Sequence, residues 1–271
     1  MQTQTLPSLD DFIKIQPENI DEFRKKGHTL IPGVLTPDEI DAYRPVIVHA
    51  ADLYNTEKRE LEDRDTYGKA FLQIMNLWQN DEDVKKFVLA KRLAKVAAEL
   101  MGVENVHIYH DQALFKEPGG GPTPWHQDQY YWPIDTNNTI TMWMPLVDID
   151  EAMGMLTFAS GSYTKGSIFN YEISDESESA FADYVAENGF PISRAKTMKA
   201  GDATWHRGFT LHHANGNNSN KMREVMTIIY VADGARITPY KNDWQKNDHA
   251  KWLMSKPIGS EIDSELNPKL L

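Results

Sequence analysis

The pattern of short apolar segments after residue 105 constrains the fold most. Two clusters of turn residues, GGGP at 119–122 and NGNNS at 215–219, separate segments of strand character, and one helical insert is expected at 175–187. Strands this short, without alternating helices, indicate an antiparallel sandwich or barrel and argue against a parallel α/β sheet. The candidate strands are residues 106–115, 125–132, 139–149, 155–159, 203–206, 210–214 and 223–232.

The first hundred residues predict mainly helices. Thr36, followed by proline and two acidic residues, is typical of a helix start, and this helix is expected to run to about residue 51. Apolar residues at helical spacing predict a second helix over 80–102, which a glycine ends. Between the two helices, residues 71–78 are expected to form a strand.

The chain shows no internal repeat and no low-complexity segment that would mark a domain boundary. We therefore expect a single domain over residues 1–271, with a helical N-terminal part at about 15–102 and a β core at about 105–235. The polar tail after Pro239 gives no prediction.

Composition excludes several classes of function. The formal net charge is −12, and a negative surface repels phosphate backbones and anionic lipid, so we expect no nucleic-acid or membrane partner. Cysteine is absent, which excludes disulfides, thiolate catalysis and cysteine-ligated metals. No apolar run is long enough to span a bilayer and the N-terminus lacks a signal-peptide pattern, so a cytoplasmic protein is expected.

The chemistry must then come from histidines, carboxylates and cofactors. Most of the nine histidines need no functional explanation. His126 and Asp128 differ, because residues two apart on a strand point to the same face and can present an imidazole and a carboxylate to one centre. Alone, such a pair is a weak signal.

A second half of the site is expected near the turn at 215–219. If the turn is central, His212 and Arg223 lie opposite one another on an antiparallel pair and enter the same cavity. His213 points to the other face, and His206 remains the alternative third ligand. Two histidines and a carboxylate form a facial triad with open metal positions, and an arginine suits bidentate carboxylate binding.

At this point the chain resembles the phytanoyl-CoA dioxygenase family of iron(II)- and 2-oxoglutarate-dependent oxygenases. The resemblance spans about residues 15–235, and the spacing of eleven from His212 to Arg223 is its most specific element. The matching segments are FRKKGHTLIPGVL at 23–35, PTPWHQD at 122–128, the stretch 154–166, AGDATWHRGFTLH at 200–212, and Asn217, Ser219 and Arg223.

The resemblance implies a fold and a set of roles. It implies a mainly β double-stranded β-helix (jelly-roll, cupin-like) core flanked by helices, which agrees with the strand pattern. It assigns His126, Asp128 and His212 as ligands of Fe(II), and Arg223 as the residue that binds the distal carboxylate of 2-oxoglutarate. With O2 as second cosubstrate, the expected reaction hydroxylates a C–H bond of a small molecule and releases succinate and CO2.

The chain departs from the family pattern at two places. Ala214 stands where a serine often lends a hydroxyl to the cosubstrate, and SGSY at 160–163 replaces Pro-Gly-Ser-His. The first departure puts in doubt which groups assist Arg223 and leaves the metal ligands untouched.

Further candidates follow from strand parity. Trp132 and Tyr130 share the parity of His126 and are expected on the substrate side, while Tyr131 is expected in the core. Ordinary β-core packing is the alternative for these aromatic residues. Three other candidates are Gln112 and Trp143 for the cosubstrate and Lys116 for the substrate.

The substrate itself is not readable from the sequence. The net charge of −12 and the aromatic residues favour a cationic or zwitterionic small molecule, through cation–π contact. Two other functions stay open: a non-catalytic jelly-roll protein that binds metal and ligand, and a zinc hydrolase that uses the same triad. The hydrolase needs a nearby general acid or base, which the sequence does not show, and it leaves Arg223 unexplained.

Overall fold

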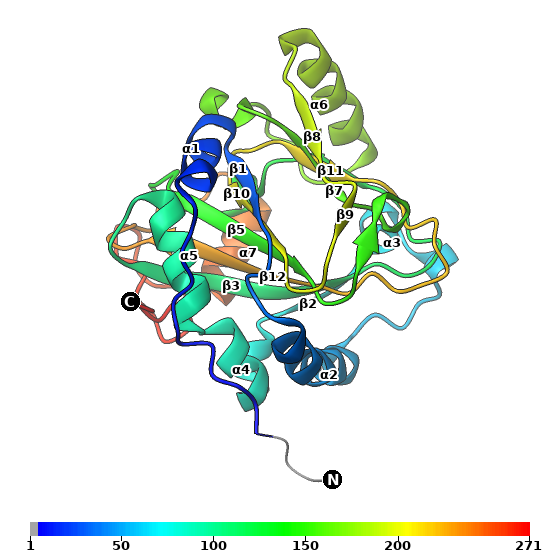
Figure 1. The fold of residues 1–271 in the computed structure, drawn as a ribbon. Coiled ribbons are helices and arrows are strands. Elements are labelled where there is room, and N and C mark those ends of the chain that lie inside the picture. The colour runs from blue at the N-terminus through cyan, green and yellow to red at the C-terminus, as the bar shows by residue number, and fades with distance from the viewer. Residues whose placement is uncertain (1–4) are drawn as a thin grey trace.

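A computed structural model describes residues 5–271 as two antiparallel sheets that face each other, with helices outside them (Figure 1). The larger sheet has the strand order β1-β10-β5-β12-β3-β2, the smaller one β4-β11-β7-β8, and β6 pairs with β9. The strands are β1 (His28–Ile31), β2 (Leu72–Met75), β3 (Val106–Phe115), β4 (Thr123–His126), β5 (Thr139–Pro145), β6 (Ile149–Asp150), β7 (Leu156–Ala159), β8 (Ile192–Arg194), β9 (Thr197–Met198), β10 (Ala203–Arg207), β11 (His212–Ala214) and β12 (Val225–Ala232). The predicted mainly β, jelly-roll core with flanking helices is confirmed.

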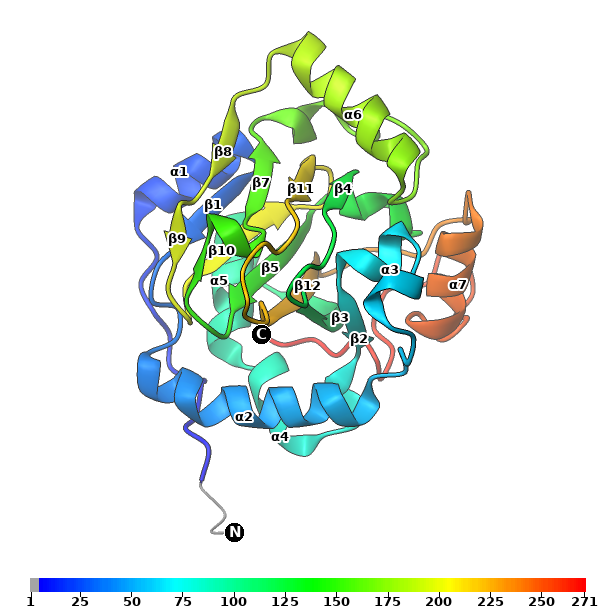
Figure 2. The same ribbon diagram turned by 90° about the vertical axis from the view of Figure 1, so that its right-hand side faces the viewer.

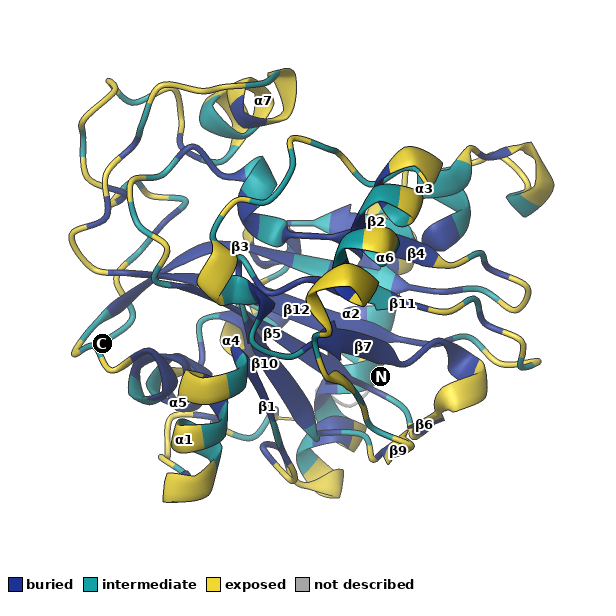
Figure 3. Cartoon of the chain, turned by 90° about the horizontal axis from the view of Figure 1, so that it is seen from above, coloured by how far each residue is buried: buried dark blue, intermediate teal, exposed yellow. Residues whose placement is uncertain are grey.

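Most helices cover the outer face of the larger sheet. Side chains of α2, α4 and α5 pack with Met142, Met226 and Trp205 of that sheet in one continuous core. Figure 3 shows the result: the strands are buried and the helices turn exposed surfaces outward. The helices are α1 (Pro17–Lys26), α2 (Pro37–Tyr54), α3 (Thr66–Ala70), α4 (Glu82–Val88), α5 (Lys91–Met101), α6 (Asp175–Asn188) and α7 (Asp243–Lys251).

The smaller sheet has its own cover. Phe181 and Val185 of α6 pack on Trp125 and Leu211, beside strands β4 and β11. Among the residues described, no helix is long and apolar enough to cross a membrane.

The N-terminal helices follow the sequence closely, with one exception. Thr36 forms a capping box with Glu39 and begins α2, as expected. The prediction of a single helix over 80–102 is wrong, because the helix breaks at 89–90 into α4 and α5. The apolar side of α4 packs on α2 and that of α5 packs on the larger sheet, so the two helix axes point in different directions. Gly102, in the left-handed conformation at φ +72°, ends α5 as predicted.

Three strand predictions need correction. The strand over 139–149 ends at Pro145, and Ile149 begins β6, which pairs with β9 outside the larger sheet. The strand over 125–132 ends at His126, because residues Asp128–Tyr131 turn into a 3-10 helix. The strand over 71–78 is limited to β2, after which Leu77–Gln79 form another 3-10 turn. The polar tail contains α7, which the sequence did not reveal.

Candidate active site

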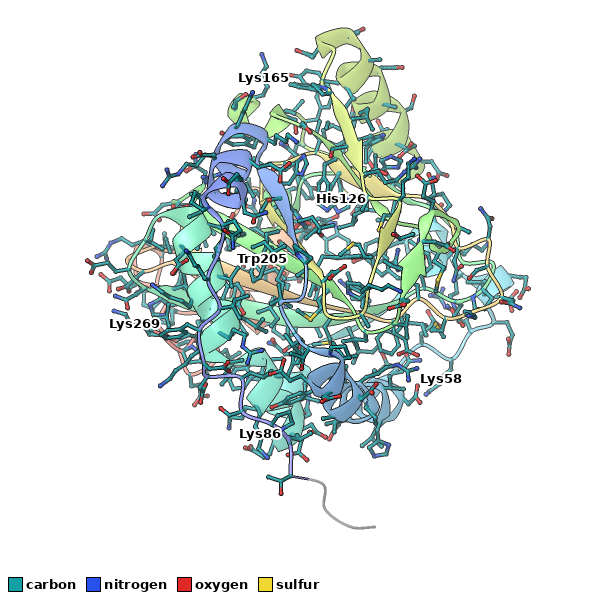
Figure 4. All side chains as sticks on the ribbon, in the orientation of Figure 1. Lys58, Lys86, His126, Lys165, Trp205 and Lys269 are labelled. Atoms are coloured by element: carbon teal, nitrogen blue, oxygen red, sulfur yellow. The ribbon has the colours of Figure 1, made fainter. Side chains whose placement is uncertain are left out.

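Three side chains converge between the two sheets. His126, Asp128 and His212 each offer a ligand atom within 4.8 Å of the others, the single such group that residues 5–271 contain. His126 at the end of β4 faces His212 of β11 across the ladder, with ring centres 4.1 Å apart. Asp128 follows in the 3-10 turn, and its Oδ1 lies 3.5 Å from Nε2 of His126 and 3.6 Å from Nε2 of His212. Figure 4 shows His126 inside the molecule among the strands.

Both imidazoles are oriented by backbone carbonyl groups. Nδ1 of His126 lies 2.8 Å from the carbonyl oxygen of Pro124, and Nδ1 of His212 lies 3.0 Å from that of Thr210. A carbonyl oxygen can only accept, so each Nδ1 donates to it, and each Nε2 is directed at the centre. Burial, with His126 beside it, holds the pKa of His212 well below its usual value, so this ring stays neutral. Two imidazoles and a carboxylate suit a divalent metal.

Asp128 is held by the opposite sheet. Its Oδ2 accepts hydrogen bonds from Oγ1 of Thr141 at 2.8 Å and from Nε2 of His206 at 3.1 Å. Those two residues are neighbours across the β5–β10 ladder. Burial opposes ionisation of Asp128, but the imidazoles around it, His212 foremost, hold its pKa well below the usual range. The sequence alternative, His206, therefore contacts the carboxylate and lies outside the three-residue group.

Arg223 is a buried cation without an acidic partner in residues 5–271. The residue is 2% exposed, its Nη1 donates to the carbonyl oxygen of Gly154 at 2.6 Å, and its Nε has no hydrogen-bond partner. The guanidinium lies 5.4 Å from the centre of the Trp143 ring, and burial lowers its pKa to about 9. A buried unpaired charge is costly, so the site is complementary to an anionic ligand.

Gly154 makes this arrangement possible. Its φ of +80° is in the region that favours glycine, and a Cβ there would lie 2.4 Å from the carbonyl oxygen of Asn215 and 3.3 Å from Nη1 of Arg223.

The predicted pairing of His212 with Arg223 is wrong. β11 pairs with β4 and β7 in the smaller sheet, while β12, which follows Arg223, lies between β5 and β3 in the larger one. The segment 215–224 crosses between sheets instead of closing a hairpin. Both side chains still line one cavity, because the cavity lies between the sheets.

The cavity, of about 150 Å³, brings together most of the predicted residues. The two histidines and aspartate of the triad, Arg223, Trp143, Gln112 and Trp132 line it. Gln112, Thr227 and Trp143 form one row across β3, β12 and β5, which explains why they share a face. Gln112 also accepts a hydrogen bond from Gln73 at 2.6 Å.

Two predicted residues do not line this cavity. The ammonium of Lys116 is buried against the carbonyl oxygen of Gly121 and Oγ1 of Thr123. Burial, and then Arg223, lowers the pKa of Lys116 to about 6. Tyr130 lies in the neighbouring surface depression, while Tyr131, expected in the core, lines the cavity. The parity argument failed here because the segment is a 3-10 turn and not a strand.

The sequence missed several cavity residues. Thr141 and His110 could have been predicted, because each lies two residues from a predicted site residue on the same strand, Trp143 and Gln112, and therefore shares its face. Trp244 and Asp248 of α7 gave no signal, since the tail lacks apolar periodicity. The others that complete the lining are Tyr67, Phe71, Gln73, Met75, Leu114, Thr123, Leu156, Ile173, His206, Ala214 and Thr227.

Known proteins share this architecture. The carbocyclase SnoK of nogalamycin biosynthesis, described as non-heme and alpha-ketoglutarate-dependent, is 22% identical, with a TM-score of 0.78 over 99% of this chain and 100% of that one. The epimerase SnoN in complex with Fe3+, alpha-ketoglutarate and nogalamycin RO is 20% identical, with a TM-score of 0.76 over 94% and 98%. A probable alpha-ketoglutarate-dependent hypophosphite dioxygenase of Stutzerimonas stutzeri is 22% identical over 230 residues, 79% of this chain and 78% of the relative.

A jelly-roll core, a triad of two imidazoles and a carboxylate, and a buried arginine without an acidic partner among the described residues define an iron- and 2-oxoglutarate-dependent dioxygenase. The family model for phytanoyl-CoA dioxygenase matches residues 23–225, and the chain belongs to that family.

Proposed function

We propose that the protein hydroxylates an unactivated C–H bond of a small molecule, with 2-oxoglutarate and O2 as cosubstrates and succinate and CO2 as products. The observation that carries the proposal is the buried Arg223, which lacks an acidic partner within residues 5–271 and lines the same cavity as the triad. Iron bound by the triad would activate O2 with electrons from the oxidative decarboxylation of 2-oxoglutarate.

The residues divide the work. His126, Asp128 and His212 would hold the metal on one face and leave the other positions open. Arg223 would bind the distal carboxylate of 2-oxoglutarate through two parallel hydrogen bonds, with the ring of Trp143 beside the guanidinium. Gln112, on the same row as Trp143, would border the cosubstrate.

The substrate side is proposed from the other lining residues. Trp132, 5% exposed, would form part of that wall and help to exclude water. The expectation that Tyr130 and Lys116 contact substrate gains no support, since neither lines the cavity.

The relatives act on small molecules, and the finer proposal is a cationic or zwitterionic one. The net charge of −12 supports this choice and opposes a nucleic-acid partner. A cytoplasmic location belongs to the same proposal, and cell fractionation tests it.

The test is an anaerobic titration of 2-oxoglutarate into Fe(II)-loaded protein, followed by the visible charge-transfer band of the chelate. We expect a band in the native protein, none in His126→Ala, and at least a tenfold higher 2-oxoglutarate requirement in Arg223→Ala. Arg194→Ala is the matched control, because Arg194 pairs with Glu151 outside the cavity and its loss should leave the titration unchanged.

Succinate formation on admitting O2 then separates the alternatives. A band without succinate above background favours the non-catalytic binding protein. No band in the native protein contradicts the proposal. The hydrolase has no glutamate among the residues that line the cavity to act as general base.

A further inference from the structure

A carboxyl group without a cationic partner among the described residues also lines the cavity. Asp248 of α7 accepts a hydrogen bond from the hydroxyl of Tyr109 at 3.1 Å and forms no ion pair with any described residue. Lys251, three residues further along α7, is exposed and does not pair with it. Burial raises the pKa of the Asp248 carboxyl to about 7, as expected for a desolvated acid without a counter-ion.

Aromatic rings line the cavity with Asp248. Tyr67 of α3 and Trp244 of α7 stack with their centres 6.5 Å apart, and Tyr131 meets Trp244 edge to face at 5.7 Å. All three line the cavity, and Figure 2 shows α3 and α7 next to each other at the edge of the sheets. Aromatic faces attract cations, most strongly where water is excluded.

His110 supplies an independent sign of a missing ligand. This residue is 3% exposed and lines the cavity, and its Nδ1 has no hydrogen-bond partner among the described residues. Burial lowers its pKa to about 3, so the ring is neutral. A neutral imidazole can accept a hydrogen bond from a cation without repelling it.

The surface next to the cavity is acidic. A surface depression shares Tyr67, Ile173 and Trp244 with the cavity, so these three side chains separate the two. No lysine or arginine lines the depression. Its acidic residues are Asp65, Glu172, Asp175, Glu176 and Asp243. Such a surface concentrates cations and repels anions.

We propose that Asp248 is the counter-ion for an ammonium group of the substrate, which the rings of Tyr67, Tyr131 and Trp244 surround. This inference rests on the proposed function and names the group that the substrate side recognises. It also gives the cavity two opposite charges: Arg223 takes the dicarboxylate cosubstrate, and Asp248 repels it. The two charges would thereby direct the two small molecules to different parts of the cavity wall.

The experiment uses probes of equal shape and different charge. Choline is compared with its neutral isostere 3,3-dimethylbutan-1-ol. Tetramethylammonium is compared with neopentyl alcohol, a neutral molecule of similar shape. Binding to the metal-loaded protein is measured by tryptophan fluorescence and by ligand-observed NMR. We expect the native protein to bind at least one ammonium probe about tenfold more tightly than its isostere.

Asp248→Asn keeps the shape of the side chain and removes the charge. It should abolish the preference for the ammonium probe, whereas Asp41→Asn, an exposed carboxylate of α2, should retain it. Equal binding of every probe and its isostere to the native protein, or an unchanged preference in Asp248→Asn, would overturn the inference.

The 2-oxoglutarate titration is run on the same samples. A charge-transfer band in Asp248→Asn shows that the substitution leaves the cosubstrate site intact. If the band is missing from the native protein while the ammonium preference is present, the proposed function fails and the ammonium site stands. If the band is present and the preference is missing, only the ammonium site fails.

Discussion

At the scale of single residues, the metal site depends on a threonine that is not itself a ligand. Oγ1 of Thr141 donates to Oδ2 of Asp128 and so fixes the carboxylate. Groups that orient ligands typically contribute about tenfold or more to metal affinity. We expect Thr141→Val to lower Fe(II) affinity about tenfold, as measured by anaerobic competition with a chromophoric chelator.

Thr204 provides the matched control for this prediction. It is buried on the neighbouring strand β10, and its hydroxyl has no hydrogen-bond partner among the described residues. Thr204→Val should leave metal affinity unchanged and keep or raise the thermal stability. Equal metal affinity of Thr141→Val and the native protein would show that His206 alone orients Asp128.

The sequence predicted the metal-binding group at this scale, although part of the reasoning was wrong. His126 and Asp128 come together through a turn after β4, not through strand alternation. His212 and Arg223 reach one cavity from different sheets. Residue type and spacing identified the chemistry, whereas the route of the backbone depends on long-range packing that a local pattern does not contain.

At the scale of elements, α7 brings a carboxylate into an environment that favours its neutral form. The folded pKa of Asp248 is about 7, above the unfolded value of 3.8, so the folded state binds more protons in this interval. Stability is therefore highest below about pH 4 for this group and falls as the pH rises to 7. We expect Asp248→Asn to remove up to about 4 kcal/mol of this fall.

The measurement is urea denaturation of both proteins, without metal, from pH 4.5 to 7.5. The difference between the two curves reports Asp248 alone, because other acids such as Asp111 titrate in both. The variant should be the more stable protein at pH 7. Parallel curves would contradict a raised pKa at Asp248.

A helix or strand could be predicted from the sequence where its own residues, and not distant packing partners, determine it. Helix α2 was predicted from its cap, and β3 from a segment of strand character before the turn at 119–122. Helix α7 was missed because its sequence is polar and lacks apolar residues at helical spacing. Gln245 is the residue of this helix that is buried. The break between α4 and α5 was missed because it depends on packing against α2 and the larger sheet, which lie elsewhere in the chain.

At the scale of the whole molecule, ligand binding and stability are coupled through Arg223. In the Fe(II)-loaded protein, 2-oxoglutarate at about a hundred times its own dissociation constant should raise the free energy of unfolding by about 2.7 kcal/mol. This corresponds to a rise in Tm of roughly 5–10 °C. Arg223→Met removes a buried unpaired cation. Its ligand-free Tm should equal or exceed that of the native protein, and the increment from 2-oxoglutarate should be lost.

Differential scanning calorimetry under nitrogen measures these increments. His126→Ala serves as the second comparison and should lose the increments of both metal and cosubstrate. A native protein whose Tm does not rise when 2-oxoglutarate joins the metal would contradict the coupling.

The cavity walls have two different origins. The triad and Arg223 are fixed by strands or by segments next to strands, whereas Tyr67, Ile173, Trp244 and Asp248 come from α3, α7 and a connecting segment outside the sheets. Mutations in that second group can therefore accumulate without disturbing the strand ladders that hold the reactive centre. Exchange of the peripheral segments can therefore change the substrate while the oxidation chemistry stays the same. The same segments are the natural targets for directed evolution.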